Sequence, residues 1–311
     1  MNTVEKYWPA LALDEWESTL KTLHMWTQIV GKIRLGLSPL QNHWWNAALY
    51  VTSRGLTTSA IPYGGDNFEI QFDFVDHRLE LITSTGKKQM ALEPRPVAAF
   101  YRELFSLLRG EGLDIKINLK PQEIPNPIPF DQDDTNRSYD PVYATRLLRI
   151  LRSTEVVFQQ YRGGFVGKSS PVHFFWGSFD LCCTRFNGRL APPRKGIITS
   201  EAYSHECISV GWWPGGGEMA GPAFYAYAAP EPVGCGEQKI RPTTGAYSKQ
   251  LNEFLLMSDD IRRSASPVND ILEFAGSAYE AAANLAGWDR ATLERERKAD
   301  SDSRLLGVKS A

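Results

Sequence analysis

The sequence predicts an α+β protein made of two similar halves, and three observations support this prediction. Apolar residues with helical spacing, followed by strand-like alternation, occur in both halves in the same order. A segment with four prolines in nine residues, 121–129, separates the halves. The halves also align so that the apolar faces of two corresponding strands coincide, which indicates antiparallel sheets with helices packed against them.

The first half is expected to begin with a long helix. Apolar residues recur at helical spacing from Trp16 to Leu37, and Asp14 precedes them as a candidate N-cap. Alternating and turn-forming residues predict the other elements of this half: strands at 43–52, 68–74, 79–83, 89–92 and 114–119, and a helix at 96–108.

The second half repeats the order of helix followed by sheet. The same patterns predict a helix at 143–161, strands at 173–184, 205–213 and 223–228, and helices at 245–256 and 267–286. The organisation we expect is a first α+β half at 1–120, a Pro-rich and acidic linker at 121–140, a second half with C-terminal helices at 141–299, and a flexible tail at 300–311, all within one compact unit.

An internal duplication is the interpretation that this repeated order favours. Aligning the halves places Trp26 on Phe158 and, after a short gap, His43 on His173. A shift of one residue would exchange the two faces of each strand, so the agreement of the apolar faces is informative. The alternative is that two segments of helix followed by antiparallel strands look alike without a common origin.

Composition narrows the possible partners. The formal net charge is −2, so nothing indicates binding to nucleic acid or to an anionic membrane. No signal peptide is recognisable, no apolar run reaches the roughly 18–20 residues of a transmembrane helix, and the four cysteines lack disulfide or zinc-ribbon spacing. We therefore expect a cytoplasmic protein. Its cofactor is unknown, and an oligomer is compatible with the sequence.

Functional residues are expected on the non-core faces of the strands. Aromatic residues there, mixed with charged ones, favour either an interface or a ligand-binding cleft. Asp180 and His205 are the candidate catalytic pair for proton transfer, but a structural ion pair of Asp180 with Arg185 or Arg54 is the favoured interpretation. The candidate ligand-binding residues are Trp44, Tyr50, Arg54, Trp176, Arg185 and Trp213.

A metal site is a weaker hypothesis. His205 and Cys207 lie two residues apart on a predicted strand, so both side chains face the same side. Asp180 and Cys182 on a neighbouring strand could complete such a site. The competing interpretation is a hydrogen-bonded histidine next to a cysteine that packs as a small apolar residue.

Several runs of residues resemble a bacterial family of uncharacterised proteins, a domain of unknown function. They include residues 23–32 (LHMWTQIVGK), 54–58 (RGLTT), 175–181 (FWGSFDL) and 213–216 (WPGG). The resemblance extends from about Trp8 to Trp288 and implies one unit rather than two independent domains. It implies no catalytic residue, substrate or cofactor.

The function we expect is small-molecule binding in an aromatic-lined cleft. If the protein is an enzyme, the residues favour acid–base or hydrolytic chemistry, with Arg54 or Arg185 holding an anionic group. The alternative is a non-catalytic interaction protein whose aromatic sheet faces cover each other or a partner subunit.

Overall fold

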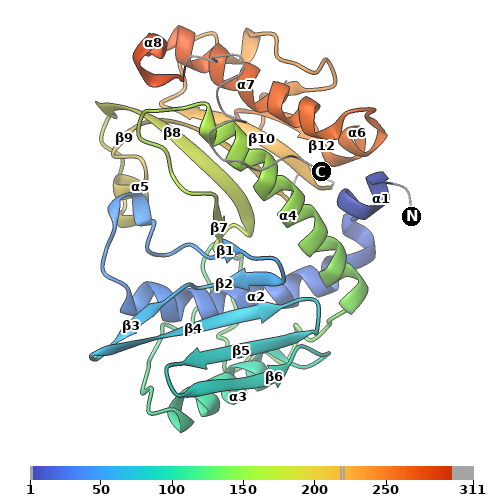
Figure 1. Cartoon of the computed structure of the whole chain (residues 1–311), viewed down its shortest axis with the longest axis vertical. Helices are drawn as coiled ribbons and strands as arrows, with labels where there is room; N and C mark the ends of the chain where they lie inside the picture. The colour runs from blue at the N-terminus through green and yellow to red at the C-terminus, as the bar shows by residue number, and fades with distance from the viewer. Residues whose placement is uncertain (1–2, 218, 220, 296–311) are drawn as a thin grey trace, which may run out of the picture.

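Two antiparallel sheets with flanking helices form an α+β fold of two similar halves in the computed structural model, which describes residues 3–217, 219 and 221–295 (Figure 1). The elements of the first half are α1 (Thr3–Tyr7), α2 (Leu13–Leu37), the 3-10 turn η1 (Asn42–Trp44), β1 (Tyr50–Val51), β2 (Gly55–Thr57), β3 (Ile61–Tyr63), β4 (Asp66–Asp73), β5 (Arg78–Thr83), β6 (Gly86–Ala91) and α3 (Val97–Gly110).

Helix α2 and strand β4 organise the first half. The strand order is β1-β2-β4-β5-β6, and β3 also pairs with β4. Strand β4 alternates as predicted, since Phe68, Ile70 and Phe72 are all buried. Trp26 of α2 is fully buried and stacks on Phe100 of α3, with ring centroids 4.7 Å apart. The predicted amphipathic helices therefore cover the apolar face of this sheet.

The second half contains the other sheet, with strand order β11-β12-β10-β9-β8-β7. Its elements are α4 (Pro141–Gly163), β7 (His173–Phe175), β8 (Asp180–Leu190), α5 (Ile197–Ala202), β9 (His205–Trp213), β10 (Ala223–Ala229), the 3-10 turn η2 (Cys235–Glu237), β11 (Ala246–Ser248), β12 (Glu253–Met257), α6 (Ser258–Arg263), α7 (Pro267–Leu285) and α8 (Arg290–Leu293).

The two faces of this second sheet differ in chemistry. On one face Val210, Trp212 and Phe224 are buried beneath helices α4 and α7, which run across the sheet in Figure 1. Phe158 of α4 packs edge to face against Phe224, with ring centroids 6.4 Å apart. The opposite face carries the polar side chains, and the candidate site is built on it.

The halves meet through main-chain and side-chain contacts. Leu49 and Phe174 exchange two main-chain hydrogen bonds of 2.9 Å, which join the β1 end of one sheet to β7 of the other. The side-chain amide of Gln28 in α2 forms two hydrogen bonds with the main chain of Gln122: it donates to the carbonyl oxygen at 2.8 Å and accepts from the N–H at 2.7 Å. The Pro-rich segment is thus held against α2.

Four predicted elements are wrong. The strand expected at 173–184 is two strands, β7 and β8, which pair antiparallel across a turn at 176–179. Residues 43–52 do not form one strand, because His43 and Trp44 adopt positive φ angles of 57° and 60° within η1. Residues 114–119 belong to no helix or strand. The helix predicted at 245–256 is instead β11 and β12, because Phe254 and Leu256 alternate inward and β12 pairs with β10.

The predicted tail at 300–311 lies outside the described residues. Within the residues that are described, no helix is long and apolar enough to cross a membrane.

Candidate functional site

A cavity of about 1220 Å³ lies over the polar face of the second sheet. The floor comes from alternate residues of β8, β9, β10 and β12, which the strand period of two places on one face. Helix α2, residues 122–125 and the segment around η1 form the opposite walls. The residues that define the floor are Asp180, Cys182, Ser209, Tyr225 and Glu253.

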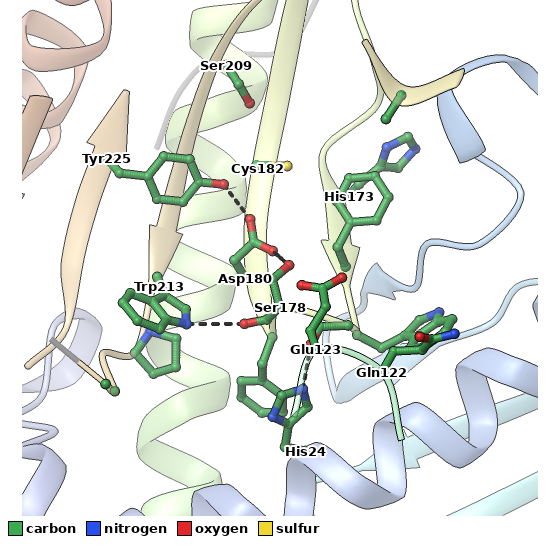
Figure 2. Close-up of a pocket in the computed structure, with 18 of the residues that line it drawn as sticks. His24, Gln122, Glu123, His173, Ser178, Asp180, Cys182, Ser209, Trp213 and Tyr225 are labelled. Carbon is green, nitrogen blue, oxygen red and sulfur yellow. Dashed lines mark hydrogen bonds between the residues drawn. The ribbon is translucent and has the colours of Figure 1, made fainter. Parts of the chain in front are cut away.

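Asp180 is the central polar residue of the cavity (Figure 2). It is 7% exposed, and its two carboxylate oxygens accept hydrogen bonds from the hydroxyls of Ser178 and Tyr225. The indole N–H of Trp213 donates to the main-chain oxygen of Ser178 at 3.1 Å. Burial raises the pKa of Asp180, while these hydroxyl donors favour the ionised form.

Gly211 allows Tyr225 to reach Asp180. A Cβ built at Gly211 would lie 2.2 Å from the Tyr225 ring, because the ring crosses directly over this position of β9. We expect Gly211→Ala to displace the ring, break its hydrogen bond to Asp180 and lower the free energy of unfolding by about 1–3 kcal/mol in urea denaturation. Gly65→Ala is the control, since nothing lies within 4 Å of the added Cβ. Equal losses in the two variants would contradict this role for Gly211.

Two further carboxyl groups line the same part of the cavity, and we call Asp180, Glu123 and Glu253 the acidic end. Burial, and then the negative charge of Asp180, raise the pKa of Glu123 and raise that of Glu253 to about 7. Glu123 lies beside Gly177, whose missing side chain leaves room for the carboxylate. None of the three forms an ion pair within the described part of the chain.

The acidic end makes stability depend on pH. Because the folded-state pKa of Glu253 is raised above the ordinary value of 4.5, folded protein binds a proton that the unfolded chain releases. The resulting stability is complete below the unfolded pKa and disappears as pH rises through about 7. We expect Glu253→Gln to be more stable than wild type by about 1–2 kcal/mol at about pH 8, with the difference shrinking toward about pH 5.

Urea denaturation across this pH range tests that expectation. Glu273→Gln in the interior of α7, exposed and outside the cavity, is the matched control and should follow the wild-type curve. A Glu253→Gln curve that also runs parallel to wild type would show that Glu253 has an ordinary pKa.

The histidines of the cavity are held neutral. Burial lowers the pKa values of His24 and His43, and burial together with Arg34 lowers that of His173 to about 3. His24 contacts the Gly177 main-chain oxygen through Nε2 at 2.8 Å. His173 is 1% exposed, and its Nδ1 has no hydrogen-bond partner among the described residues. Neutral imidazoles therefore supply no positive charge to the acidic end.

Three predicted ligand-binding residues lie in the cavity wall: Trp44, Trp176 and Trp213. Trp44 donates its indole N–H to the Ile198 main-chain oxygen at 3.1 Å, and Trp176 donates to Ala47 at 2.7 Å. These bonds fix the orientation of each ring, so the aromatic wall is preformed. Cys207, one of the weak metal candidates, also lines the cavity.

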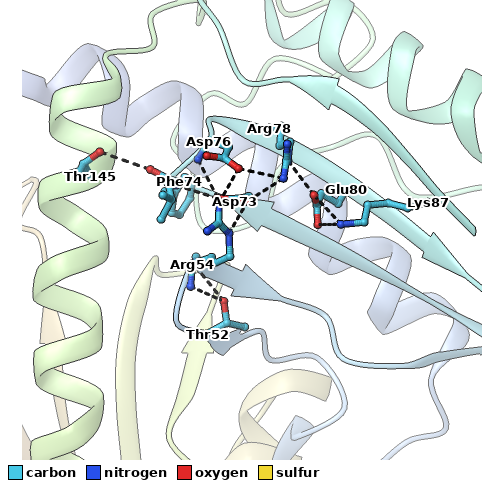
Figure 3. Close-up of polar contacts among 11 residues, drawn as sticks. Thr52, Arg54, Asp73, Phe74, Asp76, Arg78, Glu80, Lys87 and Thr145 are labelled. Carbon is cyan, nitrogen blue, oxygen red and sulfur yellow. Dashed lines mark hydrogen bonds and ion pairs between the residues drawn. The ribbon is translucent and has the colours of Figure 1, made fainter.

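Arg54 and Tyr50, two other predicted ligand-binding residues, lie outside the cavity wall. Arg54 belongs to an ion-pair network on the first sheet (Figure 3), where its Nε is 2.8 Å from the Asp73 carboxylate. Its guanidinium also pairs with Asp76 at 2.7 Å. Tyr50 packs edge-on against His173, with centroids 5.5 Å apart. Arg54 is thus paired with neighbouring carboxylates and lies outside the cavity. It is therefore not placed to hold an anionic group of a ligand there.

The prediction that Arg185 binds a ligand is also wrong for this cavity, because Arg185 lies on the helix-covered face of the sheet. The odd-numbered positions of β8 face α4 and α7, whereas Asp180 and Cys182 face the cavity. Its guanidinium carbon lies 3.6 Å from the Tyr161 ring centroid and 4.5 Å from that of Tyr279. Arg185 is therefore a buried cation held by aromatic rings.

The structure does not bring Asp180 and His205 together. In the β8–β9 hairpin His205 pairs with Leu190, while Leu181, next to Asp180, pairs with Trp212. The two side chains therefore lie at opposite ends of the hairpin, which rules out the predicted proton-transfer pair. His205 instead contacts Ser204, with its Nδ1 3.1 Å from the hydroxyl oxygen.

The same register corrects the metal hypothesis. Cys182 pairs with Gly211 and Cys207 with Phe186, so Asp180 and Cys182 do not complete a site at His205. No three His, Cys, Asp or Glu side chains within the described ranges are placed to share one metal ion.

Sequence reasoning missed three cavity residues: Glu123, Glu253 and Tyr225. Glu123 lies in a segment interpreted as a spacer, and Glu253 in a segment interpreted as a helix. Only Tyr225 could have been predicted from the sequence pattern. Phe224 and Ala226 on either side of it are buried, so the strand alternation places Tyr225 on the opposite face, which lines the cavity.

Comparison with known proteins gives a family but no activity. A family model described as a family of unknown function, DUF5996, matches residues 8–295, nearly the whole chain. No curated protein and no solved structure gives a match.

Proposed function

The chain belongs to DUF5996, a family of unknown function, and from the site itself we propose that the protein binds a small organic molecule in the cavity over the second sheet. The observation that carries this proposal is the cavity of about 1220 Å³, whose floor is formed by β8, β9, β10 and β12 and whose walls include Trp44, Trp176 and Trp213. Binding sites for small molecules are typically apolar clefts of this kind with a few convergent polar groups.

Preformed polar groups support binding rather than packing against another part of the chain. Asp180, Tyr225 and Ser178 are fixed by mutual hydrogen bonds, and Trp176 and Trp213 are fixed by bonds to main-chain oxygens. A ligand entering this cavity meets groups that need little further ordering, which favours affinity. The four free cysteines, all buried, agree with a cytoplasmic site of action, which we include in the proposal.

A thermal-shift screen with a panel of metabolites tests the proposal. A compound present at 100 times its Kd should stabilise the fold by roughly 2.7 kcal/mol. Leu255→Trp is the blocking variant, because Leu255 lines the cavity and pairs with Tyr225. It should abolish the shift.

Leu190→Trp is the matched control, since Leu190 is 76% exposed and outside the cavity wall. It should bind as wild type does. A panel in which no compound stabilises the protein, or in which every stabilising compound acts equally on Leu255→Trp, would contradict the proposal.

Acid–base catalysis is a second candidate function, favoured by the pKa of about 7 at Glu253. A carboxyl group with such a pKa can accept and return protons near neutral pH. Compounds that bind should then be turned over with a rate that changes near pH 7, and Glu253→Gln should remove that inflection. Binding without any turnover would leave binding alone as the function.

A further inference from the structure

We infer that the ligand is an organic cation, with a primary ammonium group bound at the acidic end and an aromatic or apolar body along the tryptophan wall. This inference rests on the proposed binding function and specifies its ligand class. It starts from charge: three carboxyl groups, Asp180, Glu123 and Glu253, share one part of the cavity without a cationic partner in the described residues.

The groups facing the acidic end do not neutralise it. Tyr225 and Ser178 donate hydrogen bonds to Asp180 and carry no positive charge. Lys21 of α2 lines the cavity but pairs with Glu17 at 3.0 Å. The imidazoles of His24 and His173 are kept neutral by burial, as described above. A buried carboxylate without a counter-ion is unfavourable, and a bound cation removes this cost.

The hydrogen-bonding pattern at Asp180 favours the ionised carboxylate. Ser178 donates to one oxygen and Tyr225 to the other, so both oxygens act as acceptors. An ionised carboxylate accepts only and has lone pairs left for a further donor. An ammonium group offers three N–H donors on a compact charge, so it can donate to the carboxylate of Asp180. Glu123 and Glu253 line the same cavity and are electrostatically coupled to Asp180, so they favour a positive charge there.

A second, independent feature also calls for a ligand. Nδ1 of His173 is unpartnered within the described chain although the side chain is 1% exposed, and His173 lines the same cavity. The register places His173 opposite Cys182 and Phe175 opposite Asp180, so the imidazole lies one pair of positions along the strand from the acidic end. A buried polar atom without a partner is costly, and a ligand group can supply the missing hydrogen bond.

The rest of the cavity matches an aromatic or apolar body. Trp176, Phe179 and Trp213 line the cavity together with Asp180, and Trp213 donates its indole N–H to the main chain of Ser178. Aromatic rings bury large apolar areas and also attract cations over their faces. A volume of about 1220 Å³ accommodates an organic molecule far larger than an ion.

Three probes of similar shape test the inference: 2-phenylethylammonium, neutral 2-phenylethanol and anionic 3-phenylpropionate, measured by isothermal titration calorimetry at about pH 8. The ammonium compound should bind at least about tenfold more tightly than the alcohol, and the carboxylate should bind most weakly. Asp180→Asn should lower affinity for the ammonium compound about tenfold and leave the alcohol unchanged. Asp270→Asn is the charge-removal control and should behave as wild type.

Proton release gives a readout that packing alone would not change. Binding of a cation favours the ionised form of Glu253, so calorimetry in two buffers of different ionisation enthalpy should show proton release near pH 7. Affinity should rise between about pH 6 and about pH 8, where the ammonium group stays charged. Glu253→Gln should reduce the released protons, and it keeps the test available if Asp180→Asn does not fold.

The outcomes separate this inference from the proposed function. If the alcohol or the carboxylate binds as tightly as the ammonium compound, and Leu255→Trp blocks that binding, the cavity is a ligand site and the inference is wrong. If a compound from the metabolite panel binds in the cavity but 2-phenylethylammonium does not at millimolar concentration, the inference is also wrong. If nothing binds in a way that Leu255→Trp blocks, both fail.

Discussion

Replacing Trp26 by alanine should lower the free energy of unfolding by about 3–5 kcal/mol, the largest effect we expect of a single substitution. Trp26 is 0% exposed, at the centre of α2. The centroid of its ring lies 4.7 Å from that of Phe100, on which it stacks, and 5.6 Å from that of Tyr139. Trp26 therefore packs α2 against α3 and against the segment that leads into α4. Alanine would leave a void that these rings cannot fill without moving helices.

Equilibrium denaturation in urea measures this loss. The control is Trp44→Ala, because Trp44 is only partly buried at the cavity wall and makes one hydrogen bond to the Ile198 main chain. It should lose about 1 kcal/mol. Comparable losses in both variants would mean that Trp26 does not have the central packing role described here.

Gly31→Ala should lower the free energy of unfolding by about 3 kcal/mol, at the upper end for overpacking, although alanine is normally the better helix residue. A Cβ at Gly31 would lie 2.1 Å from Cδ1 of Trp176. Trp176 cannot turn away freely, because it is buried and donates its indole N–H to Ala47 at 2.7 Å. The substitution should therefore push α2 and Trp176 apart within the cavity wall.

Gly36 provides the matched control on the same helix. Nothing lies within 4 Å of a Cβ added there, and its backbone is helical. Gly36→Ala should raise the free energy of unfolding by about 0.5–1 kcal/mol. Opposite signs for the two Gly→Ala changes are the expected result in urea denaturation, and a stabilising Gly31→Ala would disprove the contact with Trp176.

A double-mutant cycle makes this test specific. Trp176→Leu removes the ring that the new methyl group would strike, so Gly31→Ala should be far less harmful in that background. Additive losses would indicate that Gly31→Ala acts through another contact. Ligand binding by Gly31→Ala should also weaken, since Trp176 lines the cavity.

The fold class could be predicted because local patterns are strong in most elements. The helical spacing from Trp16 to Leu37 and the alternation of Phe68, Ile70 and Phe72 match α2 and β4. Prediction failed where tertiary contacts override local preference. Residues 253–257 form a strand because they pair with β10. Residues 42–44 form a 3-10 turn, in which two residues have positive φ angles that a strand does not allow.

The candidate site was predictable only in part, for a physical reason. The period of two in β8 indicates which residues share a face, and it placed Asp180 away from the core side. It does not say where along a neighbouring strand a partner lies. The hairpin register therefore separated Asp180 from His205 and joined it to Tyr225 instead.

By itself, the sequence determined the two halves, most of their helices and strands, and the three tryptophans of the cavity wall, because these depend on periodicity along the chain. Only the tertiary structure decided that Arg54 and Arg185 are satisfied elsewhere, and that Glu123 and Glu253 join Asp180. Charges are paired across space, and strand register and helix docking set those distances.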